Sequence, residues 1–191
     1  MKETQRCKTI IQGLLDFARD VKPQKTAASV NAIMQNAIAV VENEFRLKHV
    51  HIETRLSGDM PRTCLDENQI QQVFINILLN ALQAVDKNGR VTVTSQVDTH
   101  DNKINVTIAD NGCGIARNEL EKIFEPFFST KASGTGLGLS VSFGIVKSHQ
   151  GEIRAYSKPG KGTRFVVQFP IVSSAPQEKE IDEVHRCSGY R

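Results

Sequence analysis

The sequence lacks the features that would point to a membrane-embedded, secreted or nucleic-acid-binding protein. No apolar run approaches the roughly 18–20 residues that a helix needs to span a bilayer. The N-terminus carries charges on both sides of its apolar residues and has no signal-peptide core. The net charge is only +3, and the Lys and Arg residues are dispersed rather than clustered. We therefore expect a cytoplasmic globular protein without a nucleic-acid partner and without membrane contact by this chain.

Cysteine is sparse and does not form a metal-binding pattern. Cys7, Cys64, Cys113 and Cys187 lie far apart, and none shows CxxC spacing with a histidine nearby. Reduced cytosolic thiols are the expected state. The 191 residues, 39% of them hydrophobic, are enough for one well-buried domain with appendages.

The first third of the chain is predicted to be mainly helical. Residues 3–21 show apolar side chains at a three-four spacing, and Pro23 ends this helix. It is either a lone helix docked on the domain or the end of a coiled-coil-like arm that pairs with a second chain. A second helix is expected over Asn31–Leu47, and the alternation in His49–Leu56 is typical of a strand.

Asp66 is predicted to be the N-cap of a long helix, with Gln69 completing a capping-box pattern. This helix runs through Ala84 and stops near Asn88–Gly89. The remaining predicted elements are a hairpin of Arg90–Val97 and Lys103–Asp110, a short helical piece at Glu119–Phe124, a helix from the glycine-rich Ser133–Gly138 to about Gln150–Gly151, a final hairpin of EIRAYS and TRFVVQF, and a mobile polar tail from Ser173.

These elements predict an α+β fold, an α/β sandwich. A mixed, mostly antiparallel sheet of about five strands would carry three main helices on one face. The expected organisation is a short helical arm (1–22), a linker and first strand (23–30), the main domain (31–172) and the tail (173–191).

The long helix carries an unusual polar stripe opposite its apolar face. Neutral amides replace the Lys and Glu of an ordinary solvated face, although Asn is a poor helix former. An amide oxygen in a partly enclosed site is a good ligand for a hard cation such as Mg²⁺. A polar face that hydrogen-bonds a neighbouring loop is the alternative. The stripe consists of Gln69, Gln72, Asn76, Asn80 and Gln83.

Two glycine-containing segments suggest contact with a nucleotide. Asp110 ends a predicted strand just before Gly112 and Gly114, where a carboxylate can accept a hydrogen bond from an exocyclic amine such as that of adenine. A tight turn capped by Asp is the alternative. The segment Gly134–Ser140 opens a helix, where free N–H groups suit phosphates. A flexible loop without a ligand is the alternative there, and neither the Walker pattern nor the dinucleotide fingerprint fits.

Three further features complete the pattern. Phe124, Phe127 and Phe128 are expected to pin the root of a mobile segment to the core, and Lys131 places a cation where a triphosphate would lie. Gly162 permits close backbone approach at the start of the last strand, and the hydroxyl of the next residue, a threonine, can support the carboxylate of the Asp-Gly turn.

Along the chain, the asparagine helix is followed by the Asp-x-Gly-x-Gly turn, the phenylalanine segment, the glycine-rich segment and the Gly-Thr strand. This order of motifs resembles the ATP-binding domain shared by histidine kinases, gyrase, the Hsp90 chaperones and MutL. The resemblance covers roughly residues 27–172 and implies their Bergerat-type α/β sandwich, with ATP–Mg²⁺ under a mobile lid. Within the superfamily, PFFSTK-x-x-GTGLGLS is most similar to sensor histidine kinases of the nitrogen-regulation type. The resemblance implies the catalytic residues Asn76, Asn80 and Lys131, the metal ligand Asn80 with Asn76 possible, and cofactor contacts from Asn80, Asp110, Gly112, Gly114, Ile115, Phe128, Lys131, Gly134, Thr135, Gly136, Leu137, Gly138, Leu139 and Thr163.

The match departs from a complete kinase because none of the five histidines suits a phosphoacceptor. Residues 3–20 resemble the end of a second dimerisation helix, so we expect a truncated chain or a fragment that needs its acceptor in trans. The implied function is transfer of the γ-phosphate of ATP to that absent histidine in two-component signal transduction. The implied partners are the acceptor-histidine dimerisation helices of the same kinase and a cognate response regulator, with a homodimer only if the missing helix is present.

Three other functions remain open. The first is a hydrolytic, ATP-driven clamp of the gyrase or MutL kind. In those relatives the position of Asn76 holds a glutamate that activates water, and an amide cannot act as that base. A degenerate docking module is opposed by the intact asparagine, aspartate and glycine motifs. A serine-directed anti-sigma kinase fits the N-terminal helix and the phenylalanine segment poorly.

Overall fold

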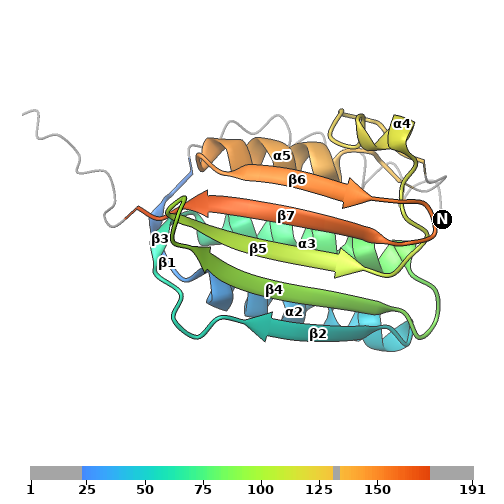
Figure 1. Ribbon diagram of the computed structural model, residues 1–191, viewed down its shortest axis with the longest axis horizontal. Coiled ribbons are helices and arrows are strands. Elements are labelled where there is room, and N and C mark those ends of the chain that lie inside the picture. Colours follow the sequence, from blue (N-terminus) through green and yellow to red (C-terminus); the bar gives the residue numbers. More distant parts are fainter. Residues whose placement is uncertain (1–22, 131–133, 173–191) are drawn as a thin grey trace, which may run out of the picture.

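A five-stranded sheet forms one layer of the structure, and helices cover one of its faces (Figure 1). The computed structural model describes residues 23–130 and 134–172. The expectations for the N-terminal arm, for Lys131 and for the C-terminal tail fall outside the described residues.

The main sheet is mixed and mostly antiparallel, as predicted. Its order is β2-β4-β5-β7-β6, and only the β2–β4 pair is parallel. Parallel neighbours need a crossover between them, and the long helix α3 supplies it. The strands are β2 (His51–Leu56), β4 (Arg90–Asp98), β5 (Lys103–Asp110), β6 (Glu152–Ser157) and β7 (Thr163–Pro170).

Three main helices lie against one face of this sheet (Figure 1). They are α2 (Val30–Leu47), α3 (Glu67–Ala84) and α5 (Gly138–Ser148), and the single turn α4 (Arg117–Leu120) lies near β6. The helical piece expected at Glu119–Phe124 is thus found two residues earlier, and after it ends at Leu120 the chain continues in turns through Phe124. Within residues 23–130 and 134–172, no helix is long and apolar enough to cross a membrane.

The predicted start of α3 is confirmed. The Oδ1 atom of Asp66 accepts a hydrogen bond from the backbone nitrogen of Gln69 at 3.1 Å. The helix ends at Ala84 because Val85 is already extended, with ψ of 150°. Its apolar side packs onto the sheet, chiefly against β5, and the buried residues of β7 alternate with more exposed ones. The core between them includes Ile70, Val73, Phe74, Ile77, Leu78, Ile104, Val106, Ile108, Phe165, Val167 and Phe169.

A second, two-stranded sheet joins the start of the domain to α3. The expected first strand is β1 (Thr26–Ala28), and it pairs antiparallel with β3 (Thr63–Leu65). Sequence analysis missed β3 because three residues are too few to reveal alternation. The buried hydroxyl of Thr63 donates to the carbonyl oxygen of Pro170 at 2.6 Å, which ties this sheet to the end of β7.

Candidate functional site

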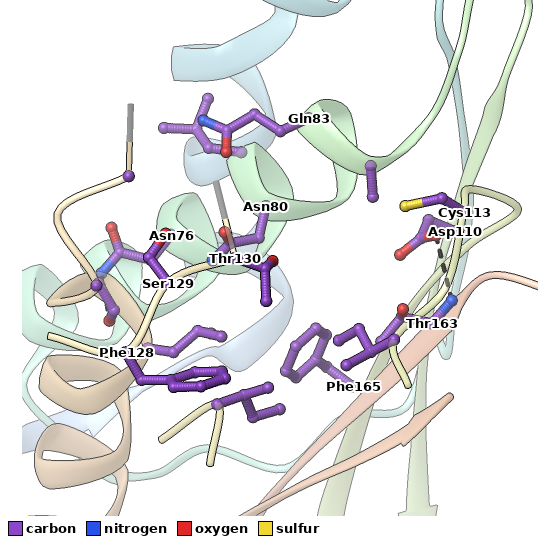
Figure 2. Close-up of a pocket in the computed structure, with 18 of the residues that line it drawn as sticks. Asn76, Asn80, Gln83, Asp110, Cys113, Phe128, Ser129, Thr130, Thr163 and Phe165 are labelled. Carbon is purple, nitrogen blue, oxygen red and sulfur yellow. Dashed lines mark hydrogen bonds between the residues drawn. The ribbon is translucent and has the colours of Figure 1, made fainter. Parts of the chain in front are cut away.

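A cavity of about 410 Å³ lies between α3, the ends of the central strands and the glycine-rich segment before α5 (Figure 2). This volume is within the range typical of small-molecule sites. It is lined by Asn76, Leu79, Asn80, Gln83, Ala84, Asp110, Cys113, Gly114, Ile115, Ile123, Phe128, Ser129, Thr130, Gly134, Thr135, Gly136, Gly138, Leu139, Thr163 and Phe165.

The first wall of the cavity is the amide stripe of α3. Asn76, Asn80 and Gln83 follow one another at spacings of four and three residues, so they share one face of the helix. The opposite face is buried in the core, which leaves this stripe facing the cavity. Figure 2 shows the two asparagines on the side of the cavity opposite Asp110.

The second wall holds a carboxylate at the end of β5. Asp110 Oδ1 accepts hydrogen bonds from the backbone nitrogens of Gly112, at 2.8 Å, and Thr163, at 3.2 Å. The second of these bonds is drawn in Figure 2. One donor comes from the turn after β5 and the other from the neighbouring strand β7, so the carboxylate has a defined orientation.

Gly162 lets the two turns of this wall meet. Its φ is +82°, and a Cβ there would collide with the carbonyl oxygen of Asp110. The hydroxyl of Ser157 donates to the carbonyl oxygen of Gly162 at 2.9 Å and accepts from the backbone nitrogen of Ile115 at 2.8 Å. Ser157 joins the two turns, and no local sequence signal identified it.

Thr163 reaches Asp110 through its backbone. Its N–H donates to the carboxylate, while its hydroxyl lies 3.0 Å from that of Ser157. Sequence analysis assigned the supporting contact to the hydroxyl. The backbone contact is set by the pairing of β5 with β7, in which Ala109 faces Arg164.

The third wall is the glycine-rich segment, and its base is a backbone contact. The N–H of Phe127 donates to the carbonyl oxygen of Gly136 at 3.0 Å, and both residues have positive φ, +66° and +70°. A Cβ on Gly136 would collide with the backbone of Phe127. Phe124 and Phe128 pack against the core as expected, but the expectation for Phe127 is wrong. Its left-handed backbone turns the ring outward, where it is 62% exposed.

Most predicted site residues line this one cavity. Gly112 and Leu137 do not: Gly112 instead donates to Asp110, and Leu137 is buried. Lys131 lies outside the described residues. Helical and strand periodicity could have found Leu79 and Phe165, which neighbour predicted residues on the same faces. Sequence analysis also missed Ala84, Cys113, Ile123, Ser129 and Thr130 as lining residues.

The described residues offer a metal ion few protein ligands. Between residues 23 and 172, leaving out 131–133, no group of three or more His, Cys, Asp or Glu side chains could hold a metal ion. A cation bound in this cavity could take oxygens from single side chains such as Asn76 and Asn80 and from a ligand, rather than from a cluster of carboxylates.

Comparison with known proteins agrees with this architecture. The model of the histidine kinase-, DNA gyrase B- and HSP90-like ATPases matches residues 65–173, more than half of the chain. The chain belongs to this ATPase family. It is 37% identical over 171 residues to the signal transduction histidine-protein kinase AtoS of Escherichia coli (strain K12), which covers 90% of the chain and 28% of AtoS. It is 35% identical over 181 residues to sporulation kinase E of Bacillus subtilis (strain 168), which covers 95% of the chain and 24% of that kinase.

Solved structures of histidine kinases have the same fold. The catalytic domain of histidine kinase ThkA, nucleotide free, superposes with a TM-score of 0.70 at 30% identity, covering 77% of this chain and 95% of that domain. ThkA in complex with the response regulator protein TrrA gives 0.76 at 27% identity, covering 90% of this chain and 49% of ThkA. Full-length ShkA in complex with AMPPNP gives 0.79 at 22% identity, covering 91% of this chain and 38% of ShkA, and supports the fold alone. The chain spans about a quarter of the length of AtoS and sporulation kinase E.

Proposed function

We propose that this chain binds ATP with Mg²⁺ in the cavity and donates the γ-phosphate to a histidine on a dimerisation helix of a sensor histidine kinase. The observation that carries the proposal is that Asp110 and Asn80 line one cavity from opposite walls (Figure 2). A purine amine and a metal-bound triphosphate need such separated partners, one an acceptor and the other a metal ligand.

Asp110 is the proposed adenine contact. Its Oδ1 is held by two backbone N–H groups, from the turn after β5 and from β7. A carboxylate oriented in this way can accept a hydrogen bond from an exocyclic amine, which adenine has and guanine lacks at that position. Ile115, Phe128 and Phe165 line the same cavity and supply the apolar surface that a flat base requires.

The α3 amides and the glycine segment form the proposed triphosphate end. The oxygen of Asn80 is a suitable Mg²⁺ ligand, and the lack of a carboxylate cluster in the described residues fits a cation held mainly by phosphates. ATP with Mg²⁺ supplies a transferable phosphoryl group with part of its charge neutralised. Backbone N–H groups at Gly134–Gly138, together with Lys131, would orient the phosphates and balance the remaining charge.

Transfer to a protein acceptor is favoured over hydrolysis. The side chain nearest to Asn80 on the previous helical turn is Asn76, and an amide cannot remove a proton from water. None of the α3 residues that line the cavity carries a carboxylate. Phosphorylation of an enclosed, aligned histidine needs no strong base from this domain, because an imidazole nitrogen is already a nucleophile at neutral pH.

The relatives support the partners that this function requires. ThkA forms a complex with a response regulator, and AtoS and sporulation kinase E are named as kinases. By analogy, this chain would act with acceptor-histidine dimerisation helices and a cognate response regulator in the cytoplasm. The kinase to which the chain contributes would be of the nitrogen-regulation type.

Calorimetric titration with AMPPNP and Mg²⁺, followed by phosphohistidine labelling, tests the proposal. We expect the chain to bind the analogue and, with ATP, to label a separately made dimerisation-helix fragment. Asn80→Asp should reduce labelling by about tenfold or more because it adds a negative charge beside the triphosphate, and Asp110→Asn should do so because it removes the charged acceptor. The matched controls are Asn68→Asp on the exposed side of α3 and Asp86→Asn in an exposed turn.

Three outcomes would contradict this function. Undiminished labelling in both site variants would remove the assigned pocket. Steady ATP turnover without any acceptor would instead support the hydrolytic alternative, and absent binding of AMPPNP would support a docking module.

A further inference from the structure

Helices α3 and α5 pack antiparallel, and polar contacts mark both ends of their interface. Asn76 lies beside Gly138 and Ser142 at the cavity end, while Asp66 lies beside His149 at the far end. Gly138 is both the first residue of α5 and part of the cavity wall. The cavity-end contact therefore bears directly on the position of that wall.

Three groups form a closed hydrogen-bond triangle at this end. The Nδ2 atom of Asn76 donates to the carbonyl oxygen of Gly138 at 3.2 Å and to the hydroxyl of Ser142 at 3.3 Å. The hydroxyl of Ser142 donates to the same carbonyl oxygen at 2.8 Å. Ser142 is fully buried, so its hydroxyl depends on partners within the protein.

The orientation of the Asn76 amide follows from this geometry. A carbonyl oxygen can only accept hydrogen bonds, so the nitrogen of the amide, not its oxygen, must face Gly138. The nitrogen is thereby engaged with α5. A role for Asn76 as a catalytic residue or as a main metal ligand has to compete with this contact.

We propose that Asn76 and Ser142 are positioning residues that hold the first turn of α5 against α3, and thereby hold the glycine wall of the cavity at Gly134–Gly138. This assignment rests on the proposed nucleotide site and deepens it. Among the described residues, the triangle at Gly138 supports the wall through side chains, and the bond between Phe127 and Gly136 supports it through the backbone.

A double-mutant cycle tests whether Asn76 and Ser142 act as a unit. Asn76→Ala and Ser142→Ala should each weaken binding of AMPPNP with Mg²⁺ by about threefold to tenfold, the loss expected for a buried hydrogen bond. The affinity of the double variant for AMPPNP should lie within about twofold of the affinity of the more impaired single variant, because the shared contact is already lost in that single variant. Fully additive losses would overturn the proposal.

Ser140→Ala is the matched control. Ser140 is buried in the same turn of α5 and donates to the carbonyl oxygen of Leu137 at 2.9 Å, but it does not line the cavity. Its substitution should leave nucleotide affinity within about twofold of wild type and show no coupling to Asn76. A loss equal to that of Ser142→Ala would mean that any buried serine in α5 has the same effect, and it would overturn the assignment.

The Asn76→Asp variant separates positioning from metal binding. A carboxylate keeps ligand oxygens for Mg²⁺ but has no N–H to donate to Gly138. The triangle predicts weaker AMPPNP binding with an unchanged Mg²⁺ concentration for half-saturation. A lowered Mg²⁺ requirement, or affinity equal to wild type, would overturn it.

Hydrogen exchange provides a readout that does not depend on nucleotide. Amides 138–142 should exchange faster in Asn76→Ala and Ser142→Ala, and no faster still in the double variant, while the far end of α5 is unchanged. If wild type fails to bind AMPPNP, the proposed function is wrong, and this exchange pattern alone decides the triangle. If Ser142→Ala does not fold, the Asn76 variants decide: unchanged exchange at 138–142 would overturn the proposal.

Discussion

The Nε2 atom of His149 lies 3.0 Å from the backbone nitrogen of Asp66 and accepts its hydrogen bond. The His149 side chain is almost fully buried, and its Nδ1 lies 2.8 Å from the carbonyl oxygen of Ile145. A carbonyl accepts only, so Nδ1 carries the proton and the ring is neutral. One imidazole thus joins the end of α5 to the start of α3.

Folding stability should fall in mild acid because of His149. Burial lowers the pKa of this histidine, and the charge of Lys25 acts in the same direction; the bond to Ile145 and the charge of Asp66 oppose them. A lowered pKa means that the unfolded chain binds the proton more readily. The contribution of neutral His149 to the free energy of unfolding is therefore complete above the unfolded pKa of about 6.5. It is lost as pH falls through the lower folded pKa, and the free energy of unfolding then changes by up to about 1.4 kcal/mol per pH unit.

Urea denaturation between pH 5 and 8 measures this effect. His149→Gln, which cannot titrate, should be less stable at pH 8 but should lose the stability change below pH 6.5. His100→Gln is the control, because that side chain is 96% exposed. An equal acid response in wild type and His149→Gln would show that other groups cause it.

Replacing Asp66 should weaken the start of α3 in two steps. Its Oδ1 accepts from Gln69 and its Oδ2 accepts from the backbone nitrogen of Gln24 at 2.8 Å. Asp66→Asn keeps an N-cap oxygen but loses an acceptor, so we expect a loss of about 1 kcal/mol; Asp66→Ala should lose about 2 kcal/mol. Chemical denaturation measures both, with exposed Asp59→Ala as the control. No loss in Asp66→Asn would show that the Gln24 contact contributes nothing, and equal losses in the two variants would show the same of the Gln69 cap.

Alanine at Gly162 should disrupt the Asp110 turn, whereas alanine at Gly160 should not. Both glycines have positive φ, +82° and +72°, so each substitution carries a left-handed strain of about 1 kcal/mol. Only at Gly162 would the new Cβ collide with Asp110, whereas at Gly160 it meets no atom within 4 Å. We expect Gly162→Ala to cost about 1–3 kcal/mol more in thermal or chemical unfolding and to weaken AMPPNP binding. Comparable effects of the two variants would contradict the crowding.

A bound nucleotide should protect Cys113 from alkylation. Cys113 is exposed and lines the cavity, whereas Cys64 lies in β3, away from it. In a Cys7→Ser, Cys187→Ser background, mass spectrometry after iodoacetamide treatment should show slower labelling of Cys113 with AMPPNP and Mg²⁺, and no change at Cys64. Protection of both cysteines would indicate a general tightening of the fold instead.

Local patterns predicted the parts of the site that depend on one element. The Asp66 cap, the amide stripe of α3 and the position of Asp110 at a strand end follow from helix and strand periodicity within a few residues. The mixed, mostly antiparallel sheet follows from the order of these elements.

The sequence by itself therefore determined which side chains share a face, and the resemblance indicated their purpose. Tertiary structure alone decided which faces meet. The contacts between Thr163 and Asp110, Asn76 and Gly138, and His149 and Asp66 join residues 53, 62 and 83 positions apart. Such contacts depend on strand order and on the packing of two helices. Periodicity carries no information about them, because it records only the environment of each element and not the identity of its neighbour.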